Sequence, residues 1–278
     1  MNHLLLYLHE SQQWQFAVID AENNVQQQQT ITQLSDLPEP LKLLPATALL
    51  SGESVLITSA ELPLTNRNKL LQAVPYAVEE QLIANVETYH FAFNKHNDDG
   101  VLPVAIVDKQ HMKSWFAQLQ DSGCKVQQLL PDFLALPYQQ NTWHIHLTSQ
   151  HAIVRTQQDM GFSIENEHLA MLLSNKLAEL EAEQRPKKII VYCKQHDWVK
   201  QLGDIDVAIE IQQYQQPLLN LFTQGLHTAP SNINLLQTPY TLTNKHYTET
   251  RKRWYWAGCA LLTFCSIWLL TSIIQWSI

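Results

Sequence analysis

The chain has 278 residues, of which 45% are apolar and 16% charged, so it can bury the cores of about two domains of ordinary size. A formal net charge of −8 at pH 7 disfavours nucleic acid as a partner of the whole chain. Only seven residues are glycine and each stands alone, so neither a G-x-G-x-x-G turn nor a Walker loop occurs. A nucleotide site built on a glycine-rich loop is therefore close to excluded.

The first 93 residues predict strands and one interrupted helix. The apolar run at residues 4–8 lacks a basic flank and a small-residue cleavage site, so it predicts a strand and not a signal peptide. Residues 66–85 have a helical pattern, which we expect Pro75 to break in two because proline removes a helical hydrogen bond. Strands are predicted at residues 4–8, 15–20, 53–59 and 88–93, the first two as a hairpin.

Two later segments share a strand–helix–strand plan, and units of this length imply parallel strands in an α/β sheet. The first segment covers residues 102–107, 109–121 and 125–130, and the second covers residues 188–192, 195–202 and 206–211. Between the two segments, the pattern predicts a hairpin of residues 143–147 and 152–156 and a long helix at residues 167–183.

Side chains with catalytic or metal-binding chemistry form no recognisable site in the sequence. His144 and His146 face one side of a predicted strand, but no carboxylate or cysteine lies nearby in sequence, and we interpret them as ordinary sheet histidines. Asp132 follows Pro131 at a predicted loop, where aspartate is a common capping residue. The four cysteines lack paired spacing, which favours buried thiols in a reducing compartment. We therefore expect no enzymatic activity, no cofactor and no metal.

The strongest signal is an uncharged run at residues 254–278, which is longer than the ~20 residues that cross a bilayer as a helix. Tryptophans stand near both of its ends, as is typical of membrane interfaces. Arg251, Lys252 and Arg253 directly precede the run, so the positive-inside rule predicts a single-pass anchor with the preceding residues in the cytoplasm. We expect these three side chains to contact anionic lipid at the membrane surface.

Small residues recur every seven positions in this run, at Gly258, Cys265 and Ser272, and so share one helix face. Such a face lets a second helix approach closely, and we expect a homodimer contact there. The alternative is that these residues are the small residues that any membrane helix contains.

Two motifs connect the chain to a known family. Residues 62–93, LPLTNRNKLLQAVPYAVEEQLIANVETYHFAF, resemble the signature region of the cytoplasmic domain of type II secretion system protein L. The matching residues are Arg67, Gln72, Ala73, Pro75, Tyr76, Ala77, Glu79, Glu80, Gln81, His90 and Phe91. Residues 231–240, SNINLLQTPY, are similar to the family's N-L-L-Q-G-x-Y motif, with Thr238 in place of the glycine. The resemblance covers essentially the whole chain.

The resemblance implies an α/β fold related to the actin-like ATPases (RNase H-like), with several β-rich cytoplasmic subdomains, one transmembrane helix and no working nucleotide site. The two hairpins expected to carry phosphate loops contain no glycine, which such loops need for close backbone approach. The implied parts are two actin-like subdomains at residues 1–93 and 141–237, a strand–helix–strand subdomain at 94–140, a basic juxtamembrane tether at 238–253 and the transmembrane helix at 254–278. The family continues into a periplasmic ferredoxin-like domain. We expect this chain to be truncated before that domain, the alternative being that the domain is missing.

The resemblance also implies a non-catalytic adaptor in the bacterial inner membrane. Such a protein recruits the cytoplasmic secretion ATPase, protein E, helps to activate it, and joins it to the platform of protein M and other proteins that drives pseudopilus assembly. We expect Arg67, Glu79 and Glu80, on the charged helical stretch, to face this partner. The alternative is that Pro75 and Tyr76 are core residues and the charges around them are only solvated.

Two other functions stay open. A membrane-tethered actin-like ATPase would need phosphate loops that the sequence does not display. A type IV pilus assembly protein shares the architecture, although its relatives usually divide the soluble part and the anchor between two chains.

Overall fold

The computed structural model describes residues 2–8, 13–63, 66–94 and 101–242. Contacts divide the chain into two compact units, Met1–Thr241 and Leu242–Ile278, and almost all described residues lie in the first. Among the described residues, no helix is long and apolar enough to cross a membrane. The predicted anchor at residues 254–278 lies outside them.

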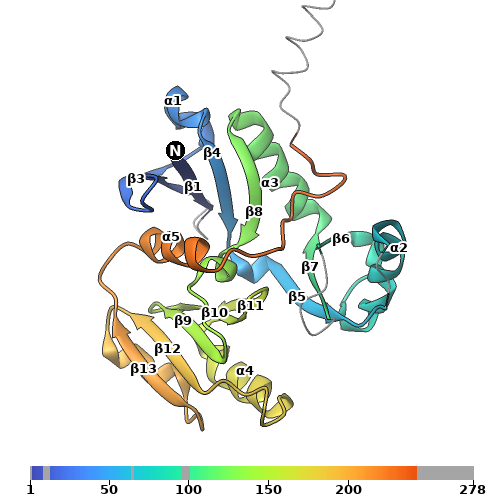
Figure 1. Ribbon diagram of the computed structural model, residues 1–278, viewed down its shortest axis with the longest axis vertical. Helices are drawn as coiled ribbons and strands as arrows, with labels where there is room; N and C mark the ends of the chain where they lie inside the picture. Colours follow the sequence, from blue (N-terminus) through green and yellow to red (C-terminus); the bar gives the residue numbers. More distant parts are fainter. Residues whose placement is uncertain (1, 9–12, 64–65, 95–100, 243–278) are drawn as a thin grey trace, which may run out of the picture. The chain divides into compact units, whose positions relative to one another are not determined.

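The first sheet has five strands in the order β3-β2-β1-β4-β8 (Figure 1). Its strands are β1 (His3–Leu8), β2 (Trp14–Ile19), β3 (Val25–Ile31), β4 (Pro45–Leu50) and β8 (Lys125–Pro131). β1 and β2 pair antiparallel, which confirms the predicted hairpin, and β1, β4 and β8 run parallel. The short helix α1 (Glu39–Lys42) precedes β4.

A second five-stranded sheet has the order β11-β10-β9-β12-β13. Its strands are β9 (Thr142–Leu147), β10 (His151–Gln157), β11 (Met160–Glu165), β12 (Lys188–Cys193) and β13 (Ala208–Gln213). The predicted hairpin is confirmed as β9 and β10, and the predicted parallel pair as β12 and β13. The helix α4 (Asn166–Glu179) packs Leu169, Leu173 and Leu177 into the core on one face of this sheet.

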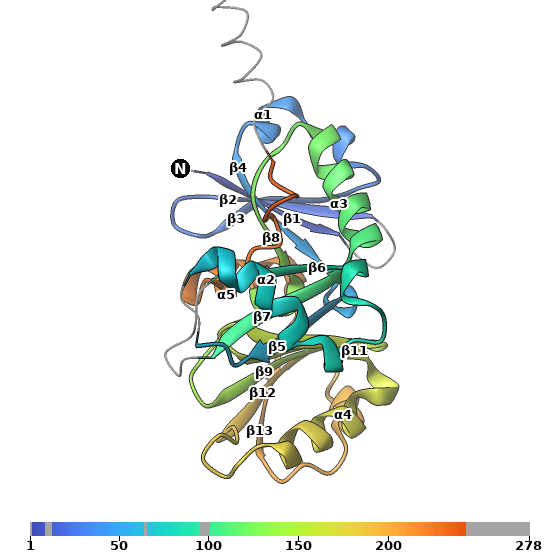
Figure 2. The same ribbon diagram turned by 90° about the vertical axis from the view of Figure 1, so that its right-hand side faces the viewer.

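The third sheet has three antiparallel strands in the order β5-β7-β6. They are β5 (Val55–Ala60), β6 (Tyr89–Phe93) and β7 (Leu102–Asp108). The helix α2 (Arg67–Ala77) packs against this sheet (Figure 2) through Leu70 and Val74, which are four residues apart and therefore on one helix face.

Two predictions about local structure are wrong. Residues 102–107 were expected to pair in parallel with residues 125–130, but β7 pairs antiparallel with β5 and β6, while β8 pairs in parallel with β4. The intervening helix α3 (Lys109–Ser122) therefore connects two different sheets. Pro75 does not break α2 in two but lies within it, and the helix ends two residues later at Ala77.

The last helix, α5 (Leu218–Thr228), lies against the 3-10 turn η5 (Asp132–Ala135) that follows β8. A Cβ atom on Gly225 would stand 2.1 Å from the carbonyl oxygen of Ala135, so this close approach requires glycine. The predicted subdomain boundaries stay a prediction. β8, within residues 94–140, joins the first sheet, whereas β5 and β6, within residues 1–93, join the third.

Candidate protein-docking site

The end of α2 and the turn after it expose an aromatic and an aliphatic side chain beside two carboxylates. Tyr76 is 69% exposed and Ile83 fully exposed, and Glu79 and Glu80 between them are also exposed. These four residues are called the α2–η3 surface, after the 3-10 turn η3 (Glu79–Gln81). Large apolar side chains exposed beside a charged rim are typical of protein-binding surfaces.

Local packing explains why these side chains point outward. Asn66 caps α2 by accepting hydrogen bonds from the backbone of Asn68 and Lys69, and Leu70 and Val74 take the buried face. The hydroxyl of Thr58 on β5 donates to the side chain of Gln81, which holds η3 against the sheet. Tyr76 is therefore not a core residue, and that part of the alternative interpretation is wrong.

Arg67 is placed differently from Glu79 and Glu80. Its Nη2 donates to Oε1 of Gln237 at 2.7 Å, its Nη1 lies 3.5 Å from the carbonyl oxygen of Phe93, and its guanidinium stands 5.5 Å from the centre of the Phe93 ring. The guanidinium thus faces the C-terminal part of the described chain. Its role in binding a partner stays a prediction, as do those of Glu79 and Glu80.

Residues 231–240, called the strap, carry the second family motif and bond the edges of two sheets. On the β8 side, the Leu235 amide donates to Leu129 O at 2.9 Å, and Asn234 Oδ1 accepts from the Leu129 amide at 3.0 Å. On the β6 side, His90 Nε2 lies 2.9 Å from Leu235 O, and Gln237 Nε2 donates to Phe93 O at 2.8 Å. Burial lowers the pKa of His90 and so favours the neutral ring, against the opposite effect of its bond to Leu235.

The start of the strap also bonds the second five-stranded sheet. Asp159, in the turn between β10 and β11, accepts from Ser231 Oγ at 2.6 Å, from the Asn232 amide at 2.9 Å and from Asn232 Nδ2 at 3.2 Å. The strap is therefore hydrogen-bonded to strands or turns of all three sheets. The two motifs, far apart in sequence, meet where Arg67 and His90 contact Gln237 and Leu235.

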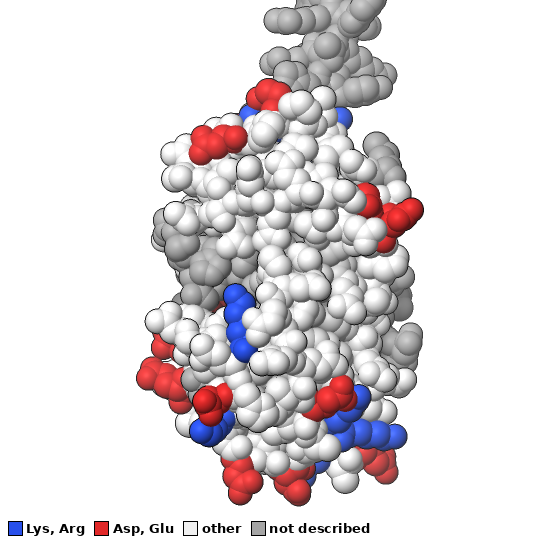
Figure 3. All heavy atoms as spheres, turned by 90° about the vertical axis from the view of Figure 1, so that its left-hand side faces the viewer, with Lys and Arg blue, Asp and Glu red and all other residues white. Residues whose placement is uncertain are grey.

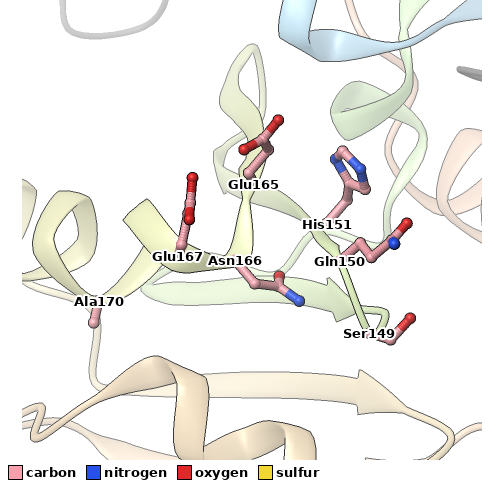
Figure 4. A pocket seen from close by; sticks show the side chains of 7 residues that line it. All are labelled: Ser149, Gln150, His151, Glu165, Asn166, Glu167 and Ala170. Atoms are coloured by element: carbon pink, nitrogen blue, oxygen red, sulfur yellow. The ribbon is translucent and has the colours of Figure 1, made fainter.

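A cavity of about 750 Å³ opens between the β9–β10 turn and the start of α4 (Figure 4). This turn belongs to one of the two hairpins expected to carry a phosphate loop; residues 9–12 of the other lie outside the described residues. The lining residues are Ser149, Gln150, His151, Glu165, Asn166, Glu167 and Ala170. None of them is Lys, Arg or Gly, and the two glutamates would repel phosphate. The cavity is therefore unsuited to the phosphates of a nucleotide.

Glu165, Glu167 and His168 form the one group in the described part of the chain whose ligand atoms, within 4.8 Å of one another, could hold a metal ion. All three residues are exposed, and no buried ligand completes a coordination shell around them. Exposed acidic groups are common without a metal, so this group indicates no metal site.

Two buried ionisable side chains, Asp132 and Arg155, connect the sheets. Neither of them was identified from the sequence as a structural residue. Asp132 is not a surface cap: its Oδ1 accepts from the Gly52 amide at 3.0 Å and Ser163 Oγ at 2.8 Å, and its Oδ2 accepts from the Tyr7 hydroxyl at 3.2 Å. Burial raises the pKa of this carboxyl to about 7, against the opposite effect of its hydrogen bonds. Asp132 thereby links β1 in the first sheet to β11 in the second five-stranded sheet.

Arg155 on β10 is completely buried and satisfies three backbone carbonyls. Its guanidinium donates to the oxygens of Leu136 at 2.5 Å, Gln158 at 2.6 Å and Ala229 at 3.0 Å. Burial lowers its pKa to about 10, so the side chain stays charged at neutral pH. The two acceptors outside its own hairpin belong to the end of η5 and the end of α5, which Arg155 therefore fixes to the sheet.

His144 and His146 are buried on the same side of β9, as predicted from their spacing. Burial is the main reason that the pKa of each falls to about 4, so both rings are neutral at pH 7. The Tyr192 hydroxyl lies 3.1 Å from His144 Nδ1, and the two rings are stacked. Among the described residues, neither histidine belongs to a group that could hold a metal.

The remaining predicted site residues lie outside the described residues. They are Arg251, Lys252 and Arg253 at the expected membrane surface and Gly258, Cys265 and Ser272 on the expected helix-pairing face. On the face drawn in Figure 3, charged side chains are sparse, and the Lys and Arg there stand mostly near Asp and Glu at one end. That face presents no basic patch of the kind that binds nucleic acid.

Comparisons with known proteins agree on one family. A family model described as type II secretion system (T2SS), protein L matches residues 5–243. The type II secretion system protein L of Pectobacterium carotovorum subsp. carotovorum is 29% identical over 232 residues, which are 82% of this chain and 51% of that protein. The protein L of Dickeya chrysanthemi is 31% identical over 128 residues, 43% of this chain and 32% of the relative. The chain spans about a third to a half of the length of the curated relatives it matches.

Solved structures give the fold. The cytoplasmic domain of EpsL, an inner-membrane component of the type II secretion system of Vibrio cholerae, superimposes with a TM-score of 0.70 at 20% identity, covering 87% of this chain and all of that one. The PilM–PilN type IV pilus biogenesis complex superimposes with a TM-score of 0.54 at 10% identity, and the match covers 82% of this chain and 98% of that one. The predicted mixed α/β, actin-like fold is thereby confirmed for the described residues. With the family model matched over residues 5–243, the chain belongs to the type II secretion system protein L family.

Proposed function

We propose that this chain is a non-catalytic adaptor that recruits the secretion ATPase, protein E, to the bacterial inner membrane and helps to activate it. Its N-terminal unit faces the cytoplasm, residues 254–278 anchor it, and it joins the ATPase to protein M and the other platform proteins that drive pseudopilus assembly. The observation that carries the proposal is the family match over residues 5–243. The relationship to an inner-membrane component of a type II secretion system supports the location.

The α2–η3 surface supports the docking role. Its exposed Tyr76 and Ile83 supply apolar area, and Glu79 and Glu80 supply negative charge for a basic partner surface. Nothing in the cavity at the β9–β10 turn favours the alternative of an actin-like ATPase, because its lining is acidic and lacks glycine. The likeness to a type IV pilus complex concerns the fold alone.

The test combines binding with turnover. The full chain in lipid nanodiscs is mixed with purified protein E of the same organism, and affinity and ATP hydrolysis are followed together. We expect a complex of about micromolar affinity or tighter, with hydrolysis raised only when protein E is present. No binding at concentrations tens of times higher contradicts the adaptor role, and hydrolysis by the chain alone, with saturable ATP binding in dialysis, supports the ATPase alternative.

A further inference from the structure

One small hydrogen-bonded group joins α2 to the strap. Arg67 on α2 donates to Gln237 on the strap, and both side chains direct a nitrogen at the carbonyl oxygen of Phe93 on β6, at 3.5 Å and 2.8 Å. Arg67 also lies over the Phe93 ring, 5.5 Å from its centre. The positive charge at the start of α2 is therefore directed toward the strap.

The two elements that this group joins have different surroundings. The far end of α2 carries the α2–η3 surface, whereas the strap ends at Tyr240, directly before the segment that contains Lys245 and the basic triplet at residues 251–253. A helix is stiff over eleven residues, so a partner that shifts the end of α2 also shifts Arg67 at its start. The geometry of the hydrogen bond from Arg67 to Gln237 therefore depends on whether a partner is docked.

From this arrangement we propose that Arg67 is a positioning residue that couples docking on the α2–η3 surface to the strap, and not a contact of the partner. This inference rests on the proposed function, because the docked partner is protein E. In such a coupling, a bound partner favours the strap in its hydrogen-bonded position, and an ordered strap in turn favours binding, by the same factor. The bond between Arg67 and Gln237 is the carrier of this coupling.

The experiment measures hydrogen exchange in residues 231–240 of the full chain in lipid nanodiscs, with and without protein E. In the wild type, protein E is expected to slow exchange of the Leu235 amide, which donates to Leu129, and of the Leu236 amide, which donates to Asn234, by about fivefold or more. Arg67→Gln is expected to abolish that slowing while weakening protein E binding by no more than the factor by which exchange slows in the wild type, about fivefold. Lys69→Gln, which removes a positive charge from the same helix at an exposed position, serves as the matched control and should behave as the wild type.

Gln237→Ala removes the same bond from the strap side, and it should reproduce the loss of slowing even if Arg67→Gln folds poorly. The double variant should lose no more of the slowing than either single variant, because both changes remove the bond that carries the coupling.

Three outcomes separate this inference from the proposed function. A loss of affinity of about tenfold or more in Arg67→Gln, with the slowing of exchange retained, makes Arg67 a direct contact and overturns the coupling. Binding of protein E without any slowing in the wild-type strap also overturns the coupling, but leaves the adaptor role intact. Failure of protein E to bind the wild type overturns both.

Discussion

The buried junction of Asp132 and Arg155 and the α2–η3 surface use charge in opposite ways. At the junction, each charged group is buried and bonded to backbone or hydroxyl groups from separate elements, so that its removal leaves unsatisfied partners. On the α2–η3 surface, Glu79 and Glu80 are exposed. Water replaces their carboxylates when they are removed, so no buried group loses its partner. Hydrogen bonding of the buried groups at the junction therefore determines stability, whereas the charges of the surface are available for binding.

The largest effect is expected at Arg155. Arg155→Met should lower the free energy of unfolding by about 3–5 kcal/mol, because the carbonyls of Leu136, Gln158 and Ala229 lose their donor inside the protein. Urea unfolding of residues 1–241 measures this. Arg185→Met, at an exposed arginine, is the control and should change stability by less than about 0.5 kcal/mol. Equal effects of the two changes would remove the distinction between junction and surface.

Buried His146 makes stability depend on pH. Its pKa of about 4 in the folded protein lies below the 6.5 of a free histidine, so the unfolded chain binds more protons between these values and stability falls as the pH is lowered. Between pH 7 and pH 4.5, the unfolding free energy of His146→Phe should therefore fall by about 2–3 kcal/mol less than that of the wild type. Unfolding measured at both pH values tests this, with the exposed His196→Phe as control. Parallel pH profiles of wild type and His146→Phe would show that His146 has the same pKa in the folded and unfolded states.

Asp132 should show the opposite pH dependence. Its pKa of about 7 in the folded protein exceeds the 3.8 of a free carboxyl, so the folded protein binds more protons and stability falls as the pH rises between these values. Asn cannot ionise, so the unfolding free energy of Asp132→Asn should rise relative to that of the wild type by about 2–3 kcal/mol between pH 5 and pH 8. A constant difference in unfolding free energy at the two pH values would mean that Asp132 is ionised throughout.

The smallest effect on stability, and the sharpest on binding, is expected at the α2–η3 surface. The double change Glu79→Lys and Glu80→Lys should leave the unfolding free energy within about 0.5 kcal/mol while weakening protein E binding about tenfold or more by charge repulsion. The double change Glu181→Lys and Glu183→Lys alters the charge equally at exposed residues elsewhere and should leave affinity unchanged. An unchanged affinity in the first variant, with a folded spectrum, excludes these two glutamates from the docking site.

Sequence patterns predicted the strands in which apolar residues alternate with polar ones or form a continuous run. β1, β2, β9, β10 and β12 appear close to their expected bounds because their apolar runs are bounded by polar turns. β3 was missed because its sequence, VQQQQTI, has four consecutive glutamines and little apolar alternation. β4, PATALL, was also missed because it begins with proline and small residues, although it is an interior strand between β1 and β8.

Strand pairing beyond the predicted neighbours could not be predicted, and neither could the junctions, because they join residues far apart in the chain. Tyr7 and Asp132 are 125 residues apart, and Arg155 and Ala229 are 74 apart. In the sequence alone, an aspartate after Pro131 is equally compatible with an exposed loop, because the residues that bury Asp132 lie far away in the chain. The exposure of Tyr76 could likewise not be predicted, since an aromatic residue in a helix that packs against a sheet is often buried.

The strap has a consequence for the order of events during synthesis. Its partners extend from Arg67 to Asp159, so every one of them is made before the strap itself. Until residues 231–240 leave the ribosome, β8 keeps an unpaired edge at Leu129 and His90 lacks its acceptor. The nascent N-terminal unit therefore exposes a strand edge that favours association with other chains, and it completes its folding only as the segment leading to the predicted anchor emerges.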